Sequence, residues 1–244
     1  MRYLWVWVIA SLAMPLASAD TSAAEPRAIA IVGTGEVGSA LGTSWGGLGH
    51  PIIYGSRTPD SEHVRQLVSD SGNARAVASA AAAAFADVIV LALPFTAALE
   101  LLPKMGSLDG KILIDPMNAL AFDRGRQRIS QSQDLLAEQL QRLAPGAHVV
   151  KAFSTLNAKK MRPDRDFDAP ISVPVAGDDR AAKQVVIDLV TELGLDGADV
   201  GPLFNARYVE AMAPLYVYMN AYARPPGGFE FAFSRSGKTV SDAD

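Results

Sequence analysis

The feature that most constrains this chain is a glycine-rich turn between an apolar strand and a helix. Residues 27–32 form a short run rich in β-branched side chains, and the next six residues are Gly33-Thr34-Gly35-Glu36-Val37-Gly38. Apolar residues then recur at helical spacing, at positions 37, 41, 45 and 48. In such a frame the three glycines permit a tight turn, close approach of a pyrophosphate, and close packing of the helix on the strand. The turn therefore predicts a dinucleotide site with its phosphates at the helix N-terminus.

The residues after the second predicted strand, 51–54, predict which dinucleotide is bound. An NAD-binding domain commonly places Asp or Glu about 20 residues after the glycines, where the carboxylate holds the ribose 2′-hydroxyl. This chain has Gly55-Ser56-Arg57-Thr58 at that place. Arg57 can bind a 2′-phosphate bidentately, and the hydroxyls of Ser56 and Thr58 are further donors. The sequence therefore favours NADP(H) over NAD.

Strands and helices alternate along the rest of the chain. We predict helices over 75–86, 96–102, 132–143 and 179–193, and strands over 87–94, 111–115, 148–153 and 171–177. Near-continuous apolar strands separated by helices indicate a parallel sheet covered on both faces. The expected fold class is α/β, a Rossmann-type doubly wound, mostly parallel sheet with helices on both faces and a short helical C-terminal cap. Pro94, Pro116 and the Ser154-Thr155 turn follow strand ends, at the edge where such sheets bind ligands.

The chain ends predict processing and domain organisation. Arg2, an apolar run over 3–16 and Ala17-Ser18-Ala19 have the layout of a cleavable secretory signal, and the run is too short for a stable membrane span. We therefore expect export to the periplasm; if residues 1–19 are not a signal, the expected location is the cytoplasm. The predicted parts are a signal peptide (1–19), a leader (20–27), an NAD(P)-binding Rossmann domain (28–200), a helical cap (201–234) and a flexible tail (235–244).

Composition excludes several classes of function. Twenty-two Lys and Arg against 26 Asp and Glu give a net charge of −4, which offers no basic field for nucleic acid. The chain has no cysteine, so disulfides, thiolate metal sites and a cysteine nucleophile are excluded, and its 3 histidines are too far apart in sequence to suggest a metal site. A G-x-S-x-G match at 42–46 lies within the first predicted helix, so we expect Ser44 to be a packing residue.

Several motifs together resemble one family. They are, in chain order, Gly33 to Gly38, Gly55-Ser56-Arg57, Val150 to Leu156, Val175 to Asp179 with Ala182-Lys183, and Gly201-Pro202-Leu203 with Ala206-Arg207 and Glu210. Over about residues 28–234 they resemble the reductases that pass hydride between NADPH and the 8-hydroxy-5-deazaflavin coenzyme F-420. The same pattern is similar to the NADP-binding domain of the STEAP metalloreductases.

The resemblance implies an NADP-dependent oxidoreductase that transfers hydride between NADPH and a deazaflavin or flavin-type acceptor. Such transfer needs two stacked rings at the sheet edge and no general acid, base or metal from the protein, so no catalytic side chain is expected. Thr34, Ser56 and Arg57 would hold the adenosine phosphates. The residues lining the nicotinamide and the acceptor ring would be Leu93, Pro94, Met117, Asn118, Ala152 and Phe153.

Two alternatives remain open at this point. One is an NADPH-dependent flavin or ferric/cupric metalloreductase, and the other is an exported, non-catalytic nucleotide-binding module. Ser154 stands where members of the family usually have Asn, which bears on how the acceptor is held. The expected partners are a small-molecule redox acceptor and a second copy of the chain, with no nucleic acid. The cap would close over the site or form a dimer face through Tyr208, Glu210, Met212 and Tyr216.

Overall fold

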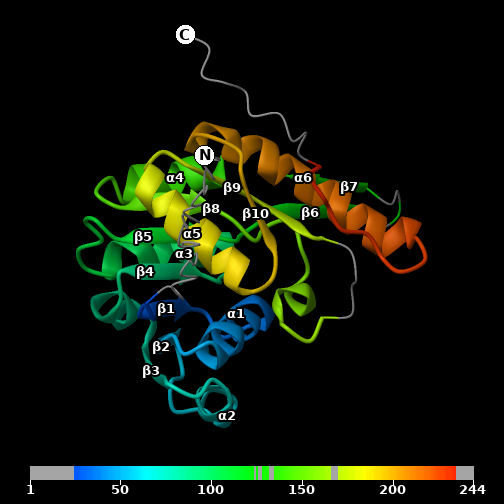
Figure 1. Ribbon diagram of the computed structural model, residues 1–244. Helices are drawn as coiled ribbons and strands as arrows, with labels where there is room; N and C mark the ends of the chain where they lie inside the picture. The colour runs from blue at the N-terminus through cyan, green and yellow to red at the C-terminus, as the bar shows by residue number, and fades with distance from the viewer. Residues whose placement is uncertain (1–24, 124, 126–127, 132–134, 166–169, 235–244) are drawn as a thin grey trace, which may run out of the picture.

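A computed structural model describes residues 25–123, 125, 128–131, 135–165 and 170–234 (Figure 1). The predicted signal peptide, most of the leader and the tail lie outside the described residues. The strands are β1 (Ile29–Val32), β2 (Ile52–Ser56), β3 (Ala74–Ala78), β4 (Val88–Leu91), β5 (Ile112–Asp115), β6 (Leu120–Asp123), β7 (Arg128–Gln131), β8 (His148–Lys151), β9 (Ser172–Gly177) and β10 (Asp196–Asp199).

The helices are of three kinds. The α-helices are α1 (Glu36–Gly47), α2 (Glu62–Asp70), α3 (Phe95–Leu101), α4 (Leu136–Leu143), α5 (Arg180–Glu192) and α6 (Ala206–Tyr218). Short 3-10 segments are η1 (Ser79–Phe85), η2 (Leu102–Lys104), η3 (Ala158–Met161) and η4 (Leu203–Asn205), and a π-helical turn, η5 (Met219–Ala223), continues α6.

Eight strands form one sheet in the order β10-β9-β8-β5-β4-β1-β2-β3. Every neighbouring pair is parallel except β8 and β9, which are antiparallel. The chain leaves β1 toward β2 and β3, then crosses back to β4 on the other side of β1. This reversal creates the crevice at the strand C-termini where doubly wound sheets bind ligands. The predicted α/β class, with its mostly parallel sheet, is confirmed.

Alternate residues of each strand face opposite layers. Ile29 and Ile31 of β1 belong to one apolar cluster with Trp45 of α1 and with residues of α2 and α5. Ala30 and Val32 belong to the other cluster, which contains residues of η1, α3 and α4. Both faces of the sheet are therefore covered, which is why its central strands are apolar at every position (Figure 1).

The predicted helix over 75–86 is wrong. Residues 74–78 form β3, which pairs in parallel register with all five residues of β2, and η1 follows as a 3-10 segment. Alanine favours a helix by intrinsic propensity, but that preference is a few tenths of a kcal/mol per residue over most other residues. Pairing with β2 satisfies a complete row of backbone groups at the sheet edge, so tertiary context decides the conformation.

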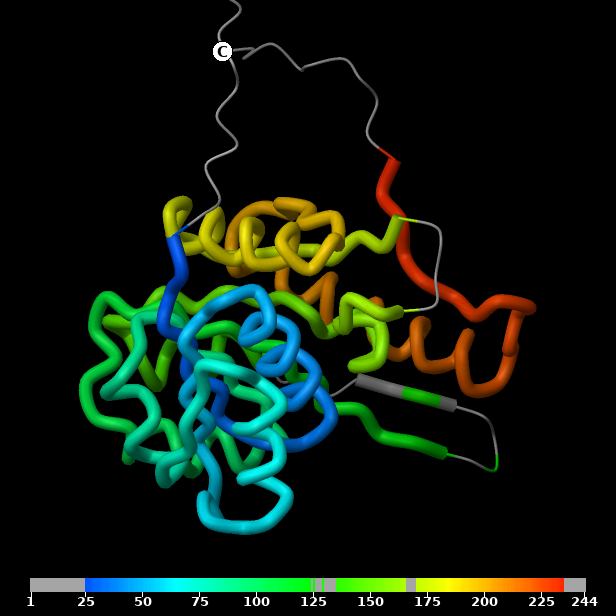
Figure 2. Tube along the Cα trace, turned by 60° about the horizontal axis from the view of Figure 1, so that its bottom comes forward, coloured from blue at the N-terminus to red at the C-terminus, as the bar shows by residue number. Residues whose placement is uncertain are grey.

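The C-terminal helical cap is also confirmed. Helix α6 lies against β7 of a small antiparallel hairpin, β6–β7, which the sequence pattern did not predict. Figure 2 shows β6 projecting from the main sheet on the same side as α6 (orange). The chain then returns along β9, where Ser172 N–H donates to Phe231 O at 2.7 Å. None of the helices in the described ranges is long and apolar enough to span a membrane.

Candidate cofactor site

Two of the three glycines in the turn after β1 are required by the fold itself. Gly33 has φ +111°, and a Cβ there would collide with the carbonyl group of Ala92 beyond β4. A Cβ at Gly38 would collide with the carbonyl oxygen of Gly33 and press on Ile31. These glycines let β1, β4 and α1 approach closely, so packing alone accounts for them.

Gly35 is different, because its surroundings are empty. It precedes the first residue of α1, is exposed, and has ordinary backbone angles (φ −79°). A Cβ at Gly35 would have no atom within 4 Å, and no side chain caps the first turn of α1. A ligand can therefore approach the backbone at Gly35, at the positive end of the helix dipole. An uncapped, unobstructed helix start is the arrangement that a pyrophosphate requires.

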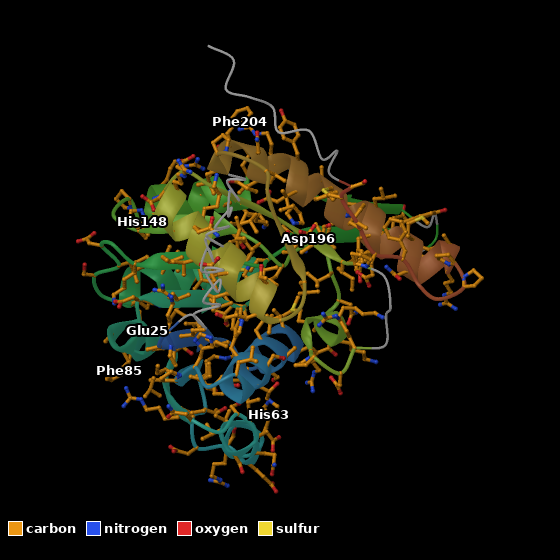
Figure 3. The ribbon with its side chains drawn as sticks, in the orientation of Figure 1. Glu25, His63, Phe85, His148, Asp196 and Phe204 are labelled. Carbon is orange, nitrogen blue, oxygen red and sulfur yellow. The ribbon has the colours of Figure 1, made fainter. Side chains whose placement is uncertain are left out.

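A pocket of about 760 Å³ opens beside this turn. Thr34, Gly35 and Glu36 line it from the turn, and His63 lines it from α2. His63 Nε2–H donates to the Thr34 carbonyl oxygen at 2.9 Å, so the imidazole holds the turn from the α2 side (Figure 3). Sequence reasoning missed His63, because nothing in its neighbourhood shows that α2 folds back onto the glycines.

The structure places Ser56 and Arg57 at the end of β2, next to the turn. Gly33 N–H donates to Gly55 O at 2.9 Å, which joins the two strand ends. Ser56 is buried, and its Oγ accepts a hydrogen bond from Thr58 N–H at 3.1 Å. Arg57 is exposed. The loop after β2 therefore has a fixed backbone and a solvent-facing guanidinium, which suits a 2′-phosphate.

The predicted nicotinamide and acceptor residues follow three neighbouring parallel strands. After β4, Leu93 is half-buried and Pro94 is exposed. After β5, Met117 is buried and Asn118 is half-buried. After β8, Ala152 and Phe153 are buried in the core, with the Phe153 ring edge-to-face on Trp45 at 5.7 Å. The strand order thus brings Leu93, Pro94 and Asn118 to one edge, whereas the Phe153 side chain points away from it.

The backbone conformation of Phe153, rather than its side chain, shapes the turn after β8. Its φ of +63° lies in the left-handed region, which is uncommon for a bulky residue. That conformation turns the chain out of β8 and brings Ser154 and Thr155 over the sheet edge. Asn118 Nδ2–H donates to the Ser154 carbonyl oxygen at 2.7 Å, so the turns after β5 and β8 are joined.

Three buried polar atoms lie without partners on these two turns. They are Asn118 Oδ1, Ser154 Oγ and Thr155 Oγ1. Buried polar atoms are nearly always hydrogen-bonded in a finished structure, and one left without a partner costs about 1–3 kcal/mol. An acceptor oxygen beside two hydroxyls is complementary to an amide or to the polar edge of a heterocycle. Together with the open turn at Gly35, these residue types fit a nicotinamide dinucleotide, and the three polar atoms lie just beneath the surface at its nicotinamide end.

A buried ion cluster lies directly behind these turns. The Lys151 ammonium, fully buried, lies 3.0 Å from Asp115 Oδ2 on β5 and 3.3 Å from Glu210 Oε1 on α6. Lys151 Nζ also donates to the Met117 carbonyl oxygen at 2.6 Å, and Asp115 Oδ1 accepts from Met117 N–H at 2.8 Å. The backbone that carries Met117 and Asn118 is therefore held by Lys151 and Asp115.

Glu210 connects this cluster to the start of α4. Its carboxylate accepts hydrogen bonds from Leu136 N–H at 3.3 Å and Ala137 N–H at 3.2 Å, at the positive end of that helix.

Tyr216, further along α6, accepts a hydrogen bond from Asn157 N–H at 2.9 Å, whereas Tyr208 is exposed. The sequence signal for the buried ion cluster was a lysine at the end of the apolar strand His148–Lys151. Its partners could not be predicted, because they come from elements far away in the sequence.

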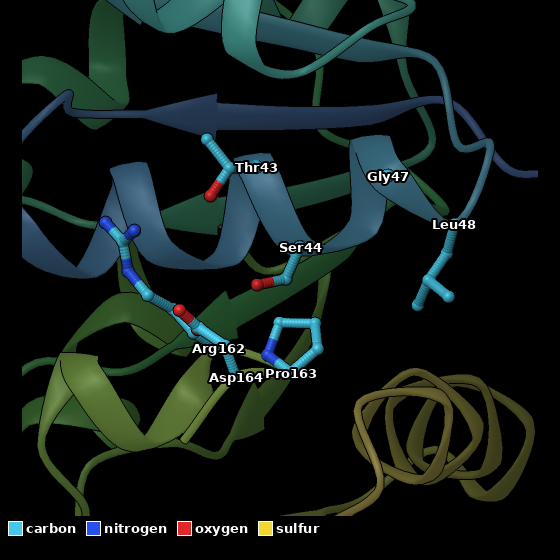
Figure 4. Close-up of a pocket in the computed structure, with 7 residues that line it drawn as sticks. All are labelled: Thr43, Ser44, Gly47, Leu48, Arg162, Pro163 and Asp164. Atoms are coloured by element: carbon cyan, nitrogen blue, oxygen red, sulfur yellow. The ribbon is translucent and has the colours of Figure 1, made fainter. Parts of the chain in front are cut away.

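Ser44 has the packing role expected from its place in the first helix. It is buried on α1 and donates to the Met161 carbonyl oxygen at 3.3 Å. Figure 4 shows it facing Arg162, Pro163 and Asp164 across a small surface pocket of about 250 Å³. Asp164 is exposed. Because Ser44 lies within a helix and its hydroxyl is committed to a carbonyl, it lacks the geometry of a nucleophile elbow.

A parallel sheet with an open glycine turn at its switch point defines the class: a Rossmann-type dinucleotide-binding protein. Within that class, the family model "NADP oxidoreductase coenzyme F420-dependent" matches residues 28–119. A solved structure of an F420-dependent NADP-reductase candidate from Arthrobacter sp. FB24 is 32% identical with TM-score 0.74, covering 85% of this chain and all of that one. The chain therefore belongs to the F420-dependent NADP oxidoreductase family.

Two curated proteins extend the comparison. The F420-dependent NADP reductase of Methanocaldococcus jannaschii is 29% identical over 148 residues, which are 58% of this chain and 65% of that protein. Metalloreductase STEAP3 of Rattus norvegicus is 30% identical over 188 residues, which are 77% of this chain and 36% of that protein. The chain thus spans less than two thirds of either relative's length.

Alanine substitutions at Gly38 and Gly35 distinguish a glycine that the fold requires from one that ligand binding requires. We expect Gly38→Ala to lower the free energy of unfolding by about 1–3 kcal/mol, because its Cβ has no room. Gly35→Ala should cost less, about 0.5–1 kcal/mol, because its Cβ enters open space and only the poorer N-cap preference of Ala counts against it. It should nevertheless weaken NADPH binding by about tenfold, since the methyl group occupies the approach of the pyrophosphate. Urea denaturation and fluorescence titration with NADPH measure the two effects, and unchanged NADPH affinity in Gly35→Ala would contradict this assignment.

The Lys151 cluster predicts a large stability effect. Lys151→Met leaves the carboxylates of Asp115 and Glu210 buried without their cation, so we expect the free energy of unfolding to fall by about 3–5 kcal/mol. Lys111→Met is the matched control, because Lys111 pairs with the exposed Asp87 and should cost only about 1 kcal/mol. Replacing both carboxylates as well, with Asn and Gln, should recover part of the loss. Equal costs for the two lysine substitutions would rule out this role for Lys151.

Proposed function

We propose that this protein binds NADP(H) and transfers hydride between its nicotinamide and a deazaflavin or flavin-type acceptor. The observation that carries the proposal is the open, uncapped start of α1 at Gly35, because neither packing nor capping of the helix accounts for it. Arg57 after β2 and the polar side chains of Asn118, Ser154 and Thr155 after β5 and β8 support the proposal, because the carboxyl ends of these parallel strands share one edge of the sheet. The family membership supports the same reaction.

Each part of this chain has a defined task in that reaction. When bound, the reduced nicotinamide supplies a hydride, which carries two electrons to the acceptor ring and leaves NADP⁺. The start of α1 holds the pyrophosphate, and Arg57 with Ser56 holds the 2′-phosphate. Asn118, Ser154 and Thr155 orient the nicotinamide end, while Leu93 and Pro94 exclude water beside it. Holding two rings in a reactive arrangement is the main contribution a protein makes to hydride transfer.

Coenzyme F420 is the leading acceptor, because both the family and the methanogen relative are named for it. The likeness to STEAP3 favours a second candidate, an NADPH-dependent flavin or ferric/cupric reductase. A non-catalytic nucleotide-binding module is the third. The three differ in what is reduced, so one assay separates them.

The test uses protein starting at residue 20, mixed with NADPH and offered coenzyme F420, FMN or ferric citrate in separate reactions. Oxidation of NADPH above a no-enzyme blank with one acceptor supports the enzyme and selects the acceptor class. NADPH binding without turnover of any acceptor supports the binding module. Failure to bind NADPH would refute the assignment of the glycine turn.

The cofactor preference has its own test. Arg57→Asp with Ser56→Ala should weaken NADPH binding by about 1–3 kcal/mol, the scale of a lost charged hydrogen bond, and NADH binding much less. Arg180→Asp, at an exposed arginine on α5, is the control and should leave both unchanged. An unaltered ratio of NADPH to NADH affinity in the double variant would show that the loop after β2 does not read the 2′-phosphate.

We also propose that the chain forms a homodimer through α6. Exposed apolar side chains recur with heptad spacing from η4 along α6: they are Phe204, which Figure 3 labels, and Tyr208, Ala211, Leu215 and Tyr218. A stripe with this spacing is complementary to a copy of itself related by a two-fold axis. Sedimentation velocity should report a dimer, and Tyr208→Lys with Leu215→Lys should convert it to a monomer.

Export is the remaining proposal, and it rests on the pattern of residues 1–19 alone. Expression of the full chain in a Gram-negative host, followed by intact-mass analysis, tests it. A mature chain that begins at Asp20 in the periplasmic fraction supports export, whereas a chain that retains Arg2 refutes it.

A further inference from the structure

A second pocket, of about 540 Å³, lies between the start of α1 and the segment that follows β8. We call it the basic pocket. Its lining residues are Glu36, Ala158, Lys159, Lys160, Arg162, Asp164 and Arg165. Four cations face two carboxylates, which gives the pocket a net charge of +2 on a chain whose net charge is −4.

The segment that carries these cations is anchored at several points. Asn157 Oδ1 accepts from Lys159 N–H at 2.9 Å and caps η3. Met161 is fully buried, and its carbonyl oxygen accepts from Ser44 on α1. Arg165 donates to Leu193 O at 2.7 Å and Gly194 O at 2.5 Å, at the end of α5. The backbone of the segment is therefore fixed on α1 and α5, so a ligand meets a preorganised group of charges.

The charges divide into anchoring and outward-facing groups. Arg165 is committed to backbone carbonyls, and Lys160 interacts electrostatically with Glu230. Lys159 and Arg162 are exposed. Arg162 also lines the pocket at the glycine turn and the pocket shown in Figure 4. Lys159 and Arg162 are thus the side chains best placed to bind an incoming anion.

The place of the basic pocket in the fold indicates which anion it would meet. The phosphates of NADP(H) already have donors, at the start of α1 and at Arg57. The basic pocket instead belongs to the segment that leaves Ser154 and Thr155, the turn assigned above to the nicotinamide and acceptor end. The chain runs from that turn directly into residues 157–162, and Glu36 at the start of α1 lines the same pocket, so the basic pocket lies beside both the glycine turn and the acceptor turn.

We propose that the basic pocket binds a phosphate or carboxylate group on the side chain of the hydride acceptor. The proposal rests on the function proposed above and adds that the acceptor is recognised by its anionic tail as well as by its ring. Lys159 and Arg162 supply the attraction, and Glu36 and Asp164 restrict the pocket to ligands that reach both cations.

The test compares acceptors that share a ring and differ in charge. FMN and riboflavin differ only by a phosphate, and coenzyme F420 is compared with the same deazaflavin ring lacking its phosphate-bearing tail. Dissociation constants are measured by ring fluorescence in low salt, with NADP⁺ bound and no turnover. We expect the phosphorylated member of at least one pair to bind about tenfold more tightly, and the difference to shrink as salt rises.

Lys159→Gln, at a residue that lines the basic pocket but not the pocket at the glycine turn, should shrink that difference several-fold and leave the phosphate-free ring and NADPH unaffected, and adding Arg162→Gln should abolish the difference. Lys104→Gln with Arg224→Gln, at exposed cations elsewhere, is the control and should change nothing. Inorganic phosphate should compete with the phosphorylated ring but not with its phosphate-free partner. Rescue by Lys159→Arg with Arg162→Lys would show that charge is the property that matters.

Three results would overturn the proposal. Equal binding of both members in each pair would show that the tail is not recognised, and so would absence of binding by either phosphorylated acceptor to protein that binds NADPH. A loss of NADPH affinity in Lys159→Gln alone would assign the pocket to the dinucleotide instead. If the unaltered protein does not bind NADPH, the proposed function itself fails, and that outcome is separate from these three.

Discussion

The architecture of the site depends most on one buried cation, the ammonium group of Lys151. It is surrounded by Asp115 from β5, Glu210 from α6 and the carbonyl oxygen of Met117, and Lys151 is fully buried. A buried charge costs several kcal/mol unless it is paired and hydrogen-bonded. Each of these buried charges would be destabilising if its partners were absent. The sheet, the turn after β5 and the C-terminal cap are therefore expected to assemble together. The edge that would hold the nicotinamide is consequently rigid from behind.

The two halves of the dinucleotide site are built in different ways. The adenosine half is local, since Gly33, Gly35, Gly38 and Arg57 lie within 25 residues of one another. Its geometry follows from a tight turn, a helix start and one parallel strand pair. The nicotinamide half is assembled from three strand ends, and its polar atoms come from Asn118, Ser154 and Thr155. Here the left-handed backbone of Phe153 and the hydrogen bond between Asn118 and Ser154 O create the surface.

This difference explains which predictions from sequence were correct. The strand–turn–helix start, the apolar central strands and the C-terminal cap were predictable because hydrophobic periodicity and glycine spacing are local signals. The helix over 75–86 was wrong, since pairing with β2 outweighs the helix propensity of alanine. The β6–β7 hairpin, His63 and the partners of Lys151 were missed because each depends on contacts between segments far apart in sequence. Phe153 was assigned to the ligand from its motif, whereas its ring packs on Trp45.

The sequence by itself determined the fold class, because near-continuous apolar strands separated by helices are buried between two helical layers, and it located the glycine turn to which the proposed function assigns the phosphates. It also determined the family, through motifs that occur in the same order along the chain. Tertiary structure alone decided which charged residues are buried together, which turns meet at the strand edge, and where Lys159 and Arg162 gather beside α1. The physical reason is that burial and pairing of polar groups are properties of segments brought into contact, and the chain order of those segments does not show which of them will touch.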